Sequence, residues 1–86
     1  MFEVQLTRDA HKFYQAADAP LVSKLNRSFD QLRRNPYKHP NIKRLKGPLA
    51  GYWRYRVGDW RVVYRVEKDN RIVVVILVAH RREAYG

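Results

Sequence analysis

Arginine and aromatic side chains alternate along residues 51–65, Gly-Tyr-Trp-Arg-Tyr-Arg-Val-Gly-Asp-Trp-Arg-Val-Val-Tyr-Arg. Alternation with a period of two is typical of a β-strand, and a Gly-Asp pair between two alternating runs is typical of a two-residue hairpin turn. A tight turn at Gly58-Asp59 would pair Val57 with Trp60, and therefore Arg56 with Arg61. Guanidinium groups bind phosphate oxygens through paired N–H donors and stay charged at neutral pH. The residue types therefore suit the binding of a phosphate-containing anion.

The predicted hairpin has two chemically different faces. The first face carries Trp53, Tyr55, Val57, Trp60, Val62 and Tyr64. The second, named the arginine face below, carries Tyr52, Arg54, Arg56, Arg61 and Arg65, with Val63 among them. Like charges directly opposite each other destabilise a sheet, so a sheet that served folding alone would avoid the Arg56–Arg61 pair. We therefore interpret the first face as core and the arginine face as a surface for an external anion.

Positive charge is concentrated in the middle of the chain. The formal net charge is +10. Residues 33–65 hold one acid, Asp59, and these ten bases: Arg33, Arg34, Lys38, Lys43, Arg44, Lys46, Arg54, Arg56, Arg61 and Arg65. Such a concentration predicts a polyanionic partner, which could be RNA, DNA or an acidic protein. Lys43, Arg44 and Lys46 are candidates for non-specific contacts with an RNA backbone. A membrane surface is disfavoured because the charge lies in a strand-rich region.

Composition bounds the remaining possibilities. A chain of 86 residues predicts a single domain, 1–86. It contains no cysteine, which excludes disulfides and thiolate metal sites, and His11 and His39 have no ligand spacing, so we expect no metal or cofactor. The N-terminal residues lack a basic region followed by an apolar run, so we expect no signal peptide. The apolar run 72–79 is too short to span a bilayer, and we expect a cytoplasmic protein.

Two helices are predicted in the N-terminal half. Residues 2–6 alternate like a short strand, and Thr7 is suited to cap a helix over residues 8–17. Asp18 is suited to cap a second helix that ends at Asn35-Pro36. The second helix has an apolar stripe with helical spacing, formed by Leu21, Leu25, Phe29 and Leu32.

Strands are predicted in the C-terminal half. Residues 42–47 suit a brief basic strand, and the arginine-rich hairpin follows it. The last strand is predicted over residues 71–79, and its unbroken apolar run from residue 72 is typical of a strand buried on both faces. This order predicts an α+β fold, in which two N-terminal helices pack on one face of a curved, mainly antiparallel sheet of about four strands. The last strand would add apolar residues to the open arginine face, so we expect a protein partner to cover part of that face.

Residues 45–64, the apolar strand and the segment His80-Arg-Arg-Glu-Ala-Tyr85 together resemble the RelE/ParE toxin superfamily of toxin–antitoxin systems. The resemblance covers essentially the whole chain. It implies a RelE-like microbial ribonuclease fold and a cognate acidic antitoxin. It also implies one of two activities: RelE-like members cleave mRNA in the ribosomal A site, and ParE-like members poison DNA gyrase.

The resemblance assigns catalytic positions. Arg54 and Arg56 match basic residues before the Gly-Asp turn, Arg61 matches an arginine after it, and Arg81 and Tyr85 match an arginine and a tyrosine near the C-terminus. This sequence differs from the best-known enzyme of the family at two of the matched positions. Tyr52 stands where that enzyme has a lysine, and Arg54 also replaces a lysine. These departures leave the identity of the general base open.

Metal-free RNA cleavage defines the roles that these residues would fill. The substrate's 2′-hydroxyl attacks the phosphate, so the enzyme must remove its proton, stabilise the charged transition state and protonate the leaving 5′-oxygen. Arg61 and Arg81 are the candidates for holding the scissile phosphate, with Arg54 assisting. Tyr85 and His80 are the candidates for proton transfer, although strict alternation would put His80 and Arg81 on opposite faces.

The favoured hypothesis is an mRNA endoribonuclease that acts on translated mRNA at the ribosome and inhibits translation. The alternatives are a ParE-like inhibitor of DNA gyrase, and a catalytically weak relative that binds RNA or its antitoxin. The set of Arg61, Arg81 and Tyr85 favours the first.

Overall fold

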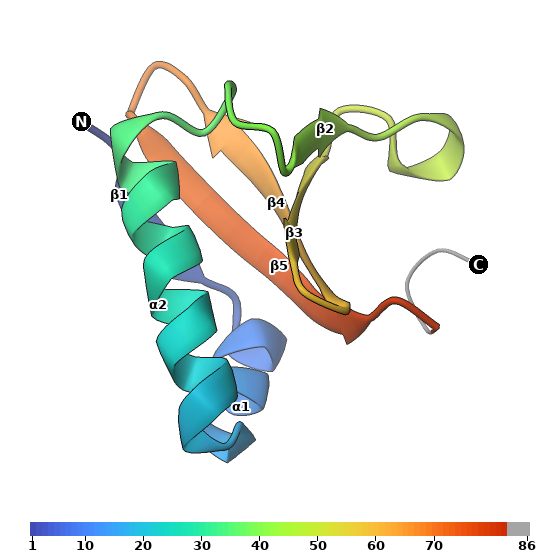
Figure 1. Ribbon diagram of the computed structural model, residues 1–86. Coiled ribbons are helices and arrows are strands. Elements are labelled where there is room, and N and C mark those ends of the chain that lie inside the picture. The colour runs from blue at the N-terminus through green and yellow to red at the C-terminus, as the bar shows by residue number, and fades with distance from the viewer. Residues whose placement is uncertain (83–86) are drawn as a thin grey trace.

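A computed structural model describes residues 1–82 of the chain. Two helices cover one face of a mixed sheet, and the other face stays open (Figure 1). The elements in chain order are β1 (Glu3–Leu6), α1 (Arg8–Ala16), α2 (Ala19–Arg34), β2 (Ile42–Arg44), the short 3₁₀ helix η1 (Gly47–Leu49), β3 (Trp53–Val57), β4 (Trp60–Glu67) and β5 (Ile72–His80). The predicted α+β class is confirmed, and the sheet has five strands where about four were predicted.

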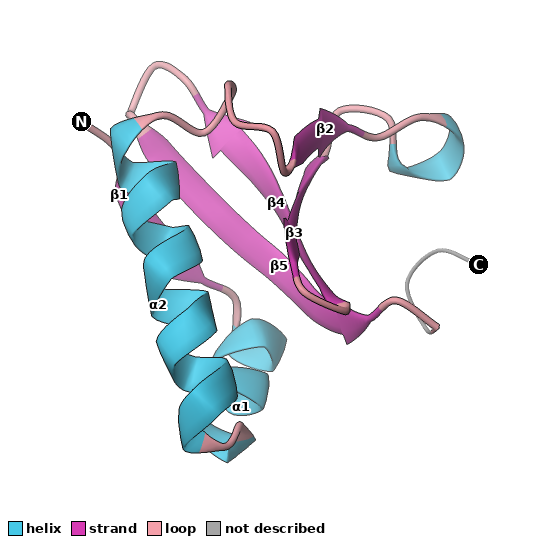
Figure 2. Ribbon diagram, in the orientation of Figure 1, coloured by secondary structure: helices cyan, strands magenta, loops and turns pink. Residues whose placement is uncertain are grey.

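The sheet brings the first and last strands of this region side by side. Its strand order is β1-β5-β4-β3-β2. β1 pairs with β5 in parallel, and the other three neighbouring pairs are antiparallel (Figure 2). The strand at β1 was predicted, but its parallel pairing with β5 was not, because a pairing between distant segments has no local sequence signal.

Both helices begin at the predicted caps. The Thr7 hydroxyl accepts a hydrogen bond from the Ala10 amide at 3.4 Å, and an Asp18 carboxylate oxygen accepts one from the Leu21 amide at 2.9 Å. These bonds satisfy amides that have no partner within the helix. α2 ends at Arg34, where the Asn35 amide still donates to Gln31 before the chain turns away. No helix within residues 1–82 is both long and apolar enough to cross a membrane.

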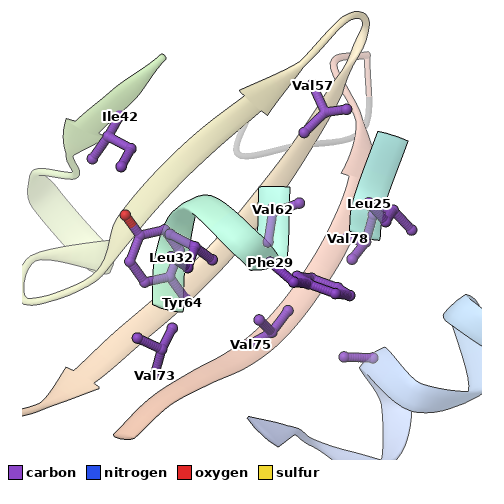
Figure 3. Close-up of a cluster of buried hydrophobic side chains, with 11 residues drawn as sticks. Leu25, Phe29, Leu32, Ile42, Val57, Val62, Tyr64, Val73, Val75 and Val78 are labelled. Carbon is purple, nitrogen blue, oxygen red and sulfur yellow. The ribbon is translucent and has the colours of Figure 1, made fainter. Parts of the chain in front are cut away.

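The helix-covered face of the sheet contains the core. Leu25, Phe29 and Leu32 of α2 point toward Val62 and Tyr64 of β4 (Figure 3). The Tyr64 side chain is fully buried, and its hydroxyl donates a 2.7 Å hydrogen bond to the Pro36 carbonyl. Burial raises the pKa of this phenol well above its usual value, and nearby Tyr55 and Tyr37 act in the same direction. The neutral hydroxyl therefore ties the loop after α2 to the middle of the sheet.

The hairpin of β3 and β4 has the predicted register. Val57 pairs with Trp60, Arg56 with Arg61 and Arg54 with Val63. Gly58 has φ +58°, a value that glycine adopts readily and that suits the first central position of a type II′ turn. This register puts alternate side chains of the hairpin into the core and onto the open face, as the sequence predicts.

A β-bulge interrupts the pairing of β4 with β5. Val63 pairs with Leu77, whereas the next residue, Tyr64, pairs with Val75, so Ile76 is the extra residue. The bulge shifts the alternation of β5 by one residue. As a result Val75 and Val78 both belong to the buried core.

Candidate functional site

The arginine face lies on the side of the sheet that the helices leave open. Arg54, Arg56, Arg61 and Arg65 come from β3 and β4, and Lys43 joins them from β2. The strand register sets Lys43 directly opposite Arg54 and Arg56 directly opposite Arg61. Two like-charged cross-strand pairs are therefore adjacent on one surface, an arrangement that weakens the sheet and attracts anions.

The arginines at the two ends of the hairpin differ in their partners. At the far end, Arg65 forms an ion pair with Glu67, and the hydrogen bond from Arg65 lowers the pKa of that carboxyl. At the turn end, an Arg61 guanidinium nitrogen donates to the Trp60 carbonyl at 3.3 Å. Within residues 1–82, neither Arg56 nor Arg61 forms an ion pair. An anion would therefore bind most strongly near the turn.

The Arg54 side chain is hydrogen-bonded to the backbone just before β2. One of its guanidinium nitrogens donates to the Asn41 carbonyl at 3.1 Å, and the same carbonyl accepts from the Arg56 amide at 2.9 Å. The guanidinium has five N–H donors in all.

Val63 shows a second role of the arginines. It lies on the open face but is completely buried. It stands opposite Arg54 and between Arg61 and Arg65 along β4. We infer that the methylene stems of these arginines cover it while their charged ends stay in water.

Apolar residues of β5 also lie on the open face, next to the arginines. Val74 and Ala79 of β5 point to the open side but are 8% and 6% exposed, and Leu77 is the β5 residue that stays prominent at 43%. The last strand therefore adds apolar residues to the open face, as predicted, but only Leu77 among these three is well exposed. The expectation of a covering partner now depends mainly on charge.

Arg81 is joined to the hairpin turn. Its amide donates a 2.7 Å hydrogen bond to the Asp59 carbonyl, and its guanidinium lies 3.7 Å from an Asp59 carboxylate oxygen. Ala79, two residues earlier, pairs with Arg61. The structure thus brings Arg81 to the turn end of the arginine face. Asp59 was assigned to the turn alone from sequence, although its position as the one acid among ten bases was a signal.

His80 and Arg44 lie on the other face. His80 pairs with Trp60, and its ring meets the indole edge-on, with centroids 5.2 Å apart. The Arg44 guanidinium carbon lies 5.3 Å from the centroid of the Trp53 ring. The structure therefore does not bring His80 together with Arg61, or Arg44 together with Lys43.

The remaining candidates border the arginine face or fall outside the described residues. Tyr52 precedes β3, where its amide donates to Leu49 and its carbonyl accepts from Leu45, both at 3.0 Å. Lys46 is exposed and directly precedes η1, which projects on the side away from the helices (Figure 1). Tyr85 lies outside the described residues, so its place in the site stays a prediction.

The sequence and the fold are similar to those of known proteins. Residues 4–85 match the family described as the ParE toxin of the type II toxin-antitoxin system parDE. The chain belongs to the RelE/ParE superfamily of type II toxins. This RelE/ParE toxin is 32% identical to Toxin RelG of Mycobacterium tuberculosis over 84 residues, which are 98% of this chain and 91% of RelG.

Solved structures of RelE/ParE toxins share the fold. The toxin-antitoxin complex RelBE2 from Mycobacterium tuberculosis contains a chain that superposes with a TM-score of 0.81 at 26% identity, covering 93% of this chain and 98% of that one. The YoeB/ParE toxin from Agrobacterium tumefaciens superposes with a TM-score of 0.77 at 31% identity, covering 92% and 98%. The predicted superfamily is therefore confirmed.

Proposed function

We propose that this RelE/ParE toxin is a metal-independent endoribonuclease that cleaves mRNA during translation at the ribosome. One observation carries the proposal: Arg56, Arg61 and Arg81 converge at the turn end of the open face. Phosphoryl chemistry needs oriented cations where negative charge develops, and guanidinium groups supply two donors each. This activity would act in the cytoplasm and inhibit translation.

In the proposed reaction, the arginines bind the phosphate and one further group transfers the proton. Arg61 and Arg81 hold the non-bridging oxygens of the scissile phosphate, and Arg54 adds a further donor. The 2′-hydroxyl loses its proton, attacks the phosphorus and forms a cyclic phosphate, while the 5′-oxygen leaves and takes up a proton. Arg56, Tyr52, Lys43, Lys46 and Arg65 bind the flanking RNA, with Tyr52 available to stack on a base.

We assign the proton transfer to Tyr85. A tyrosine placed beside guanidinium groups would have its pKa lowered toward neutral pH, because the positive charges favour the phenolate. His80 is the weaker candidate because its ring packs against Trp60 on the helix-covered face. It would have to leave that contact to reach a phosphate beside Arg61. Arg44 is likewise reassigned from RNA binding to a cation–π contact over the Trp53 ring.

An acidic antitoxin is the proposed protein partner. The net charge of +10 and the uncompensated arginines favour a negatively charged protein. A similar chain in the RelBE2 structure is found in a toxin–antitoxin complex. We propose that the antitoxin covers the arginine face and thereby blocks access of RNA.

Controlled expression followed by mapping of RNA 5′ ends tests the function. Cuts within translated codons are expected, and they should disappear with Arg61→Gln. Lys12→Gln on the exposed surface of α1 is the matched control, because it removes one positive charge far from the arginine face. Intact RNA during growth arrest would contradict the proposal.

Gyrase inhibition is the second candidate function, because the matching family description is that of ParE. A supercoiling assay on the same protein separates the two candidates. Inhibited supercoiling with intact RNA would establish the gyrase function. RNA binding without either activity would identify a catalytically weak relative.

A further inference from the structure

Asp59 is an acid in a strongly basic region. It lies in the two-residue turn between β3 and β4, and residues 33–65 contain no other carboxylate. Its negative charge must weaken the attraction of the arginine face for an anion. A charge that opposes ligand binding at the edge of a candidate site needs an explanation beyond the turn, since turn geometry requires glycine at position 58 and not an acid at position 59.

Two contacts connect Asp59 with Arg81. The backbone bond from the Arg81 amide to the Asp59 carbonyl fixes where the Arg81 side chain begins. The ion pair between the carboxylate and the guanidinium, at 3.7 Å, then restricts where that side chain ends. Both side chains are more than half exposed, at 57% and 63%, so the pair contributes little to folding stability. Its effect must therefore be sought in the orientation of Arg81.

We propose that Asp59 is a positioning residue for Arg81, whose guanidinium it holds beside Arg61 before a phosphate binds. The proposal rests on the endoribonuclease function proposed above. An arginine side chain has many rotamers, and a phosphate clamp that is already oriented loses less freedom on reaching the transition state. Asp59 thus weakens the binding of RNA but increases the rate at which bound RNA is cut.

These opposite effects give the proposal a distinctive test. Asp59→Asn keeps the size of the side chain and the backbone bond but removes the charge. We expect the dissociation constant for an RNA oligonucleotide to stay equal or fall, while the single-turnover cleavage rate on ribosomes falls about 10-fold. Asp59→Glu, which retains the carboxylate, should recover most of the rate. The matched control is Asp69→Asn, which removes the same charge from the exposed turn between β4 and β5.

A double-mutant cycle tests whether Asp59 acts through Arg81. In an Arg81→Ala background, Asp59→Asn should change the cleavage rate by less than about 2-fold, because the group that it positions is gone. An equal loss in both backgrounds would show that Asp59 acts on something else and would overturn the proposal. A wild-type cleavage rate in Asp59→Asn, with Arg81→Ala impaired, would overturn it as well.

A measurement of motion separates this proposal from the proposed function. The ¹⁵N order parameter of the Arg81 side-chain Nε–H should fall in Asp59→Asn and stay unchanged in Asp69→Asn. An unchanged order parameter in Asp59→Asn would overturn positioning by Asp59, whatever the protein cleaves. Absence of RNA cleavage by the wild-type protein would instead overturn the endoribonuclease function and the catalytic consequence drawn from it.

Discussion

Single arginines on the open face have two opposite effects on stability. We infer that their stems cover the buried Val63, whereas their charged ends are paired with like charges across Arg56–Arg61 and Arg54–Lys43. Covering an apolar residue stabilises the fold, whereas opposed like charges cost free energy. A substitution that removes the charge but keeps the stem can therefore separate the two contributions to stability.

Arg61→Gln removes the charge and keeps most of the stem. We expect the free energy of unfolding to rise by about 0.2–1 kcal/mol, because the repulsion from Arg56 is relieved. Removing one transition-state donor should lower the RNA cleavage rate by about 10²–10³-fold. Urea denaturation and single-turnover cleavage measure the two effects. A less stable variant would show that the repulsion is already screened, and full activity would remove Arg61 from the site.

Tyr64→Phe tests the buried hydroxyl. The loss of the bond to Pro36 leaves a buried carbonyl without that donor, which should lower the free energy of unfolding by about 1–3 kcal/mol. Because the folded-state pKa of Tyr64 lies above its unfolded value, the neutral phenol stabilises the fold fully below about pH 10, and this contribution is lost as pH rises further.

Urea denaturation of wild type and Tyr64→Phe between neutral and alkaline pH measures the difference. The stability gap between the two proteins should narrow above about pH 10, by up to 1.4 kcal/mol per pH unit. A constant gap across that range would mean that the hydroxyl titrates normally in the folded protein.

The sequence predicts some residues of the candidate site better than others. Arg54, Arg56 and Arg61 were placed correctly, because strict alternation around a Gly-Asp turn fixes the face of each residue. Alternation also puts His80 on the face opposite Arg81, as observed, but it did not settle whether His80 reaches the site. It gave no indication that Asp59 pairs with Arg81, because that partner lies beyond a different strand. Contacts between segments that are distant in sequence have no local pattern.

At the scale of elements, the helix caps determine where α2 begins. Asp18→Ala removes the acceptor for the Leu21 amide and should lower the free energy of unfolding by about 1 kcal/mol. Asp18→Asn is the control, because asparagine caps a helix about as well and removes the same charge. Thermal or urea unfolding measures both. Equal destabilisation by the two variants would assign the effect to the charge and not to the cap.

The elements differ in how far their pairing could be predicted. The β3–β4 hairpin was predicted to the residue, because its turn and its two-residue period agree. The unbroken apolar run of β5 has no alternation, so nothing in it indicates the bulge at Ile76 or the residues that face the core. The sequence of β1 does not indicate its parallel pairing with β5 either, since such a short strand fits either edge of the sheet.

For the whole molecule, net charge should control the rate of partner binding. We expect association with an acidic antitoxin to slow at least 10-fold between about 50 and 500 mM NaCl, because screening removes long-range attraction. Dissociation should change much less, since it depends on short-range contacts. Stopped-flow mixing at several salt concentrations measures both rates. A salt-independent association rate would contradict electrostatic guidance by the +10 charge.

The position of β5 also determines when, during synthesis of the chain, the sheet can form. β5 lies between β1 and β4, and it is the last strand to be synthesised in the described chain. Until it is available, β1 has no neighbour in the sheet and β4 has an unpaired edge. Pairing between such distant segments is slow to nucleate and cannot begin from an N-terminal fragment. Chains that stop before Ile72 should therefore remain unfolded and harmless, and a cell translating this message meets folded toxin only after β5 has been synthesised.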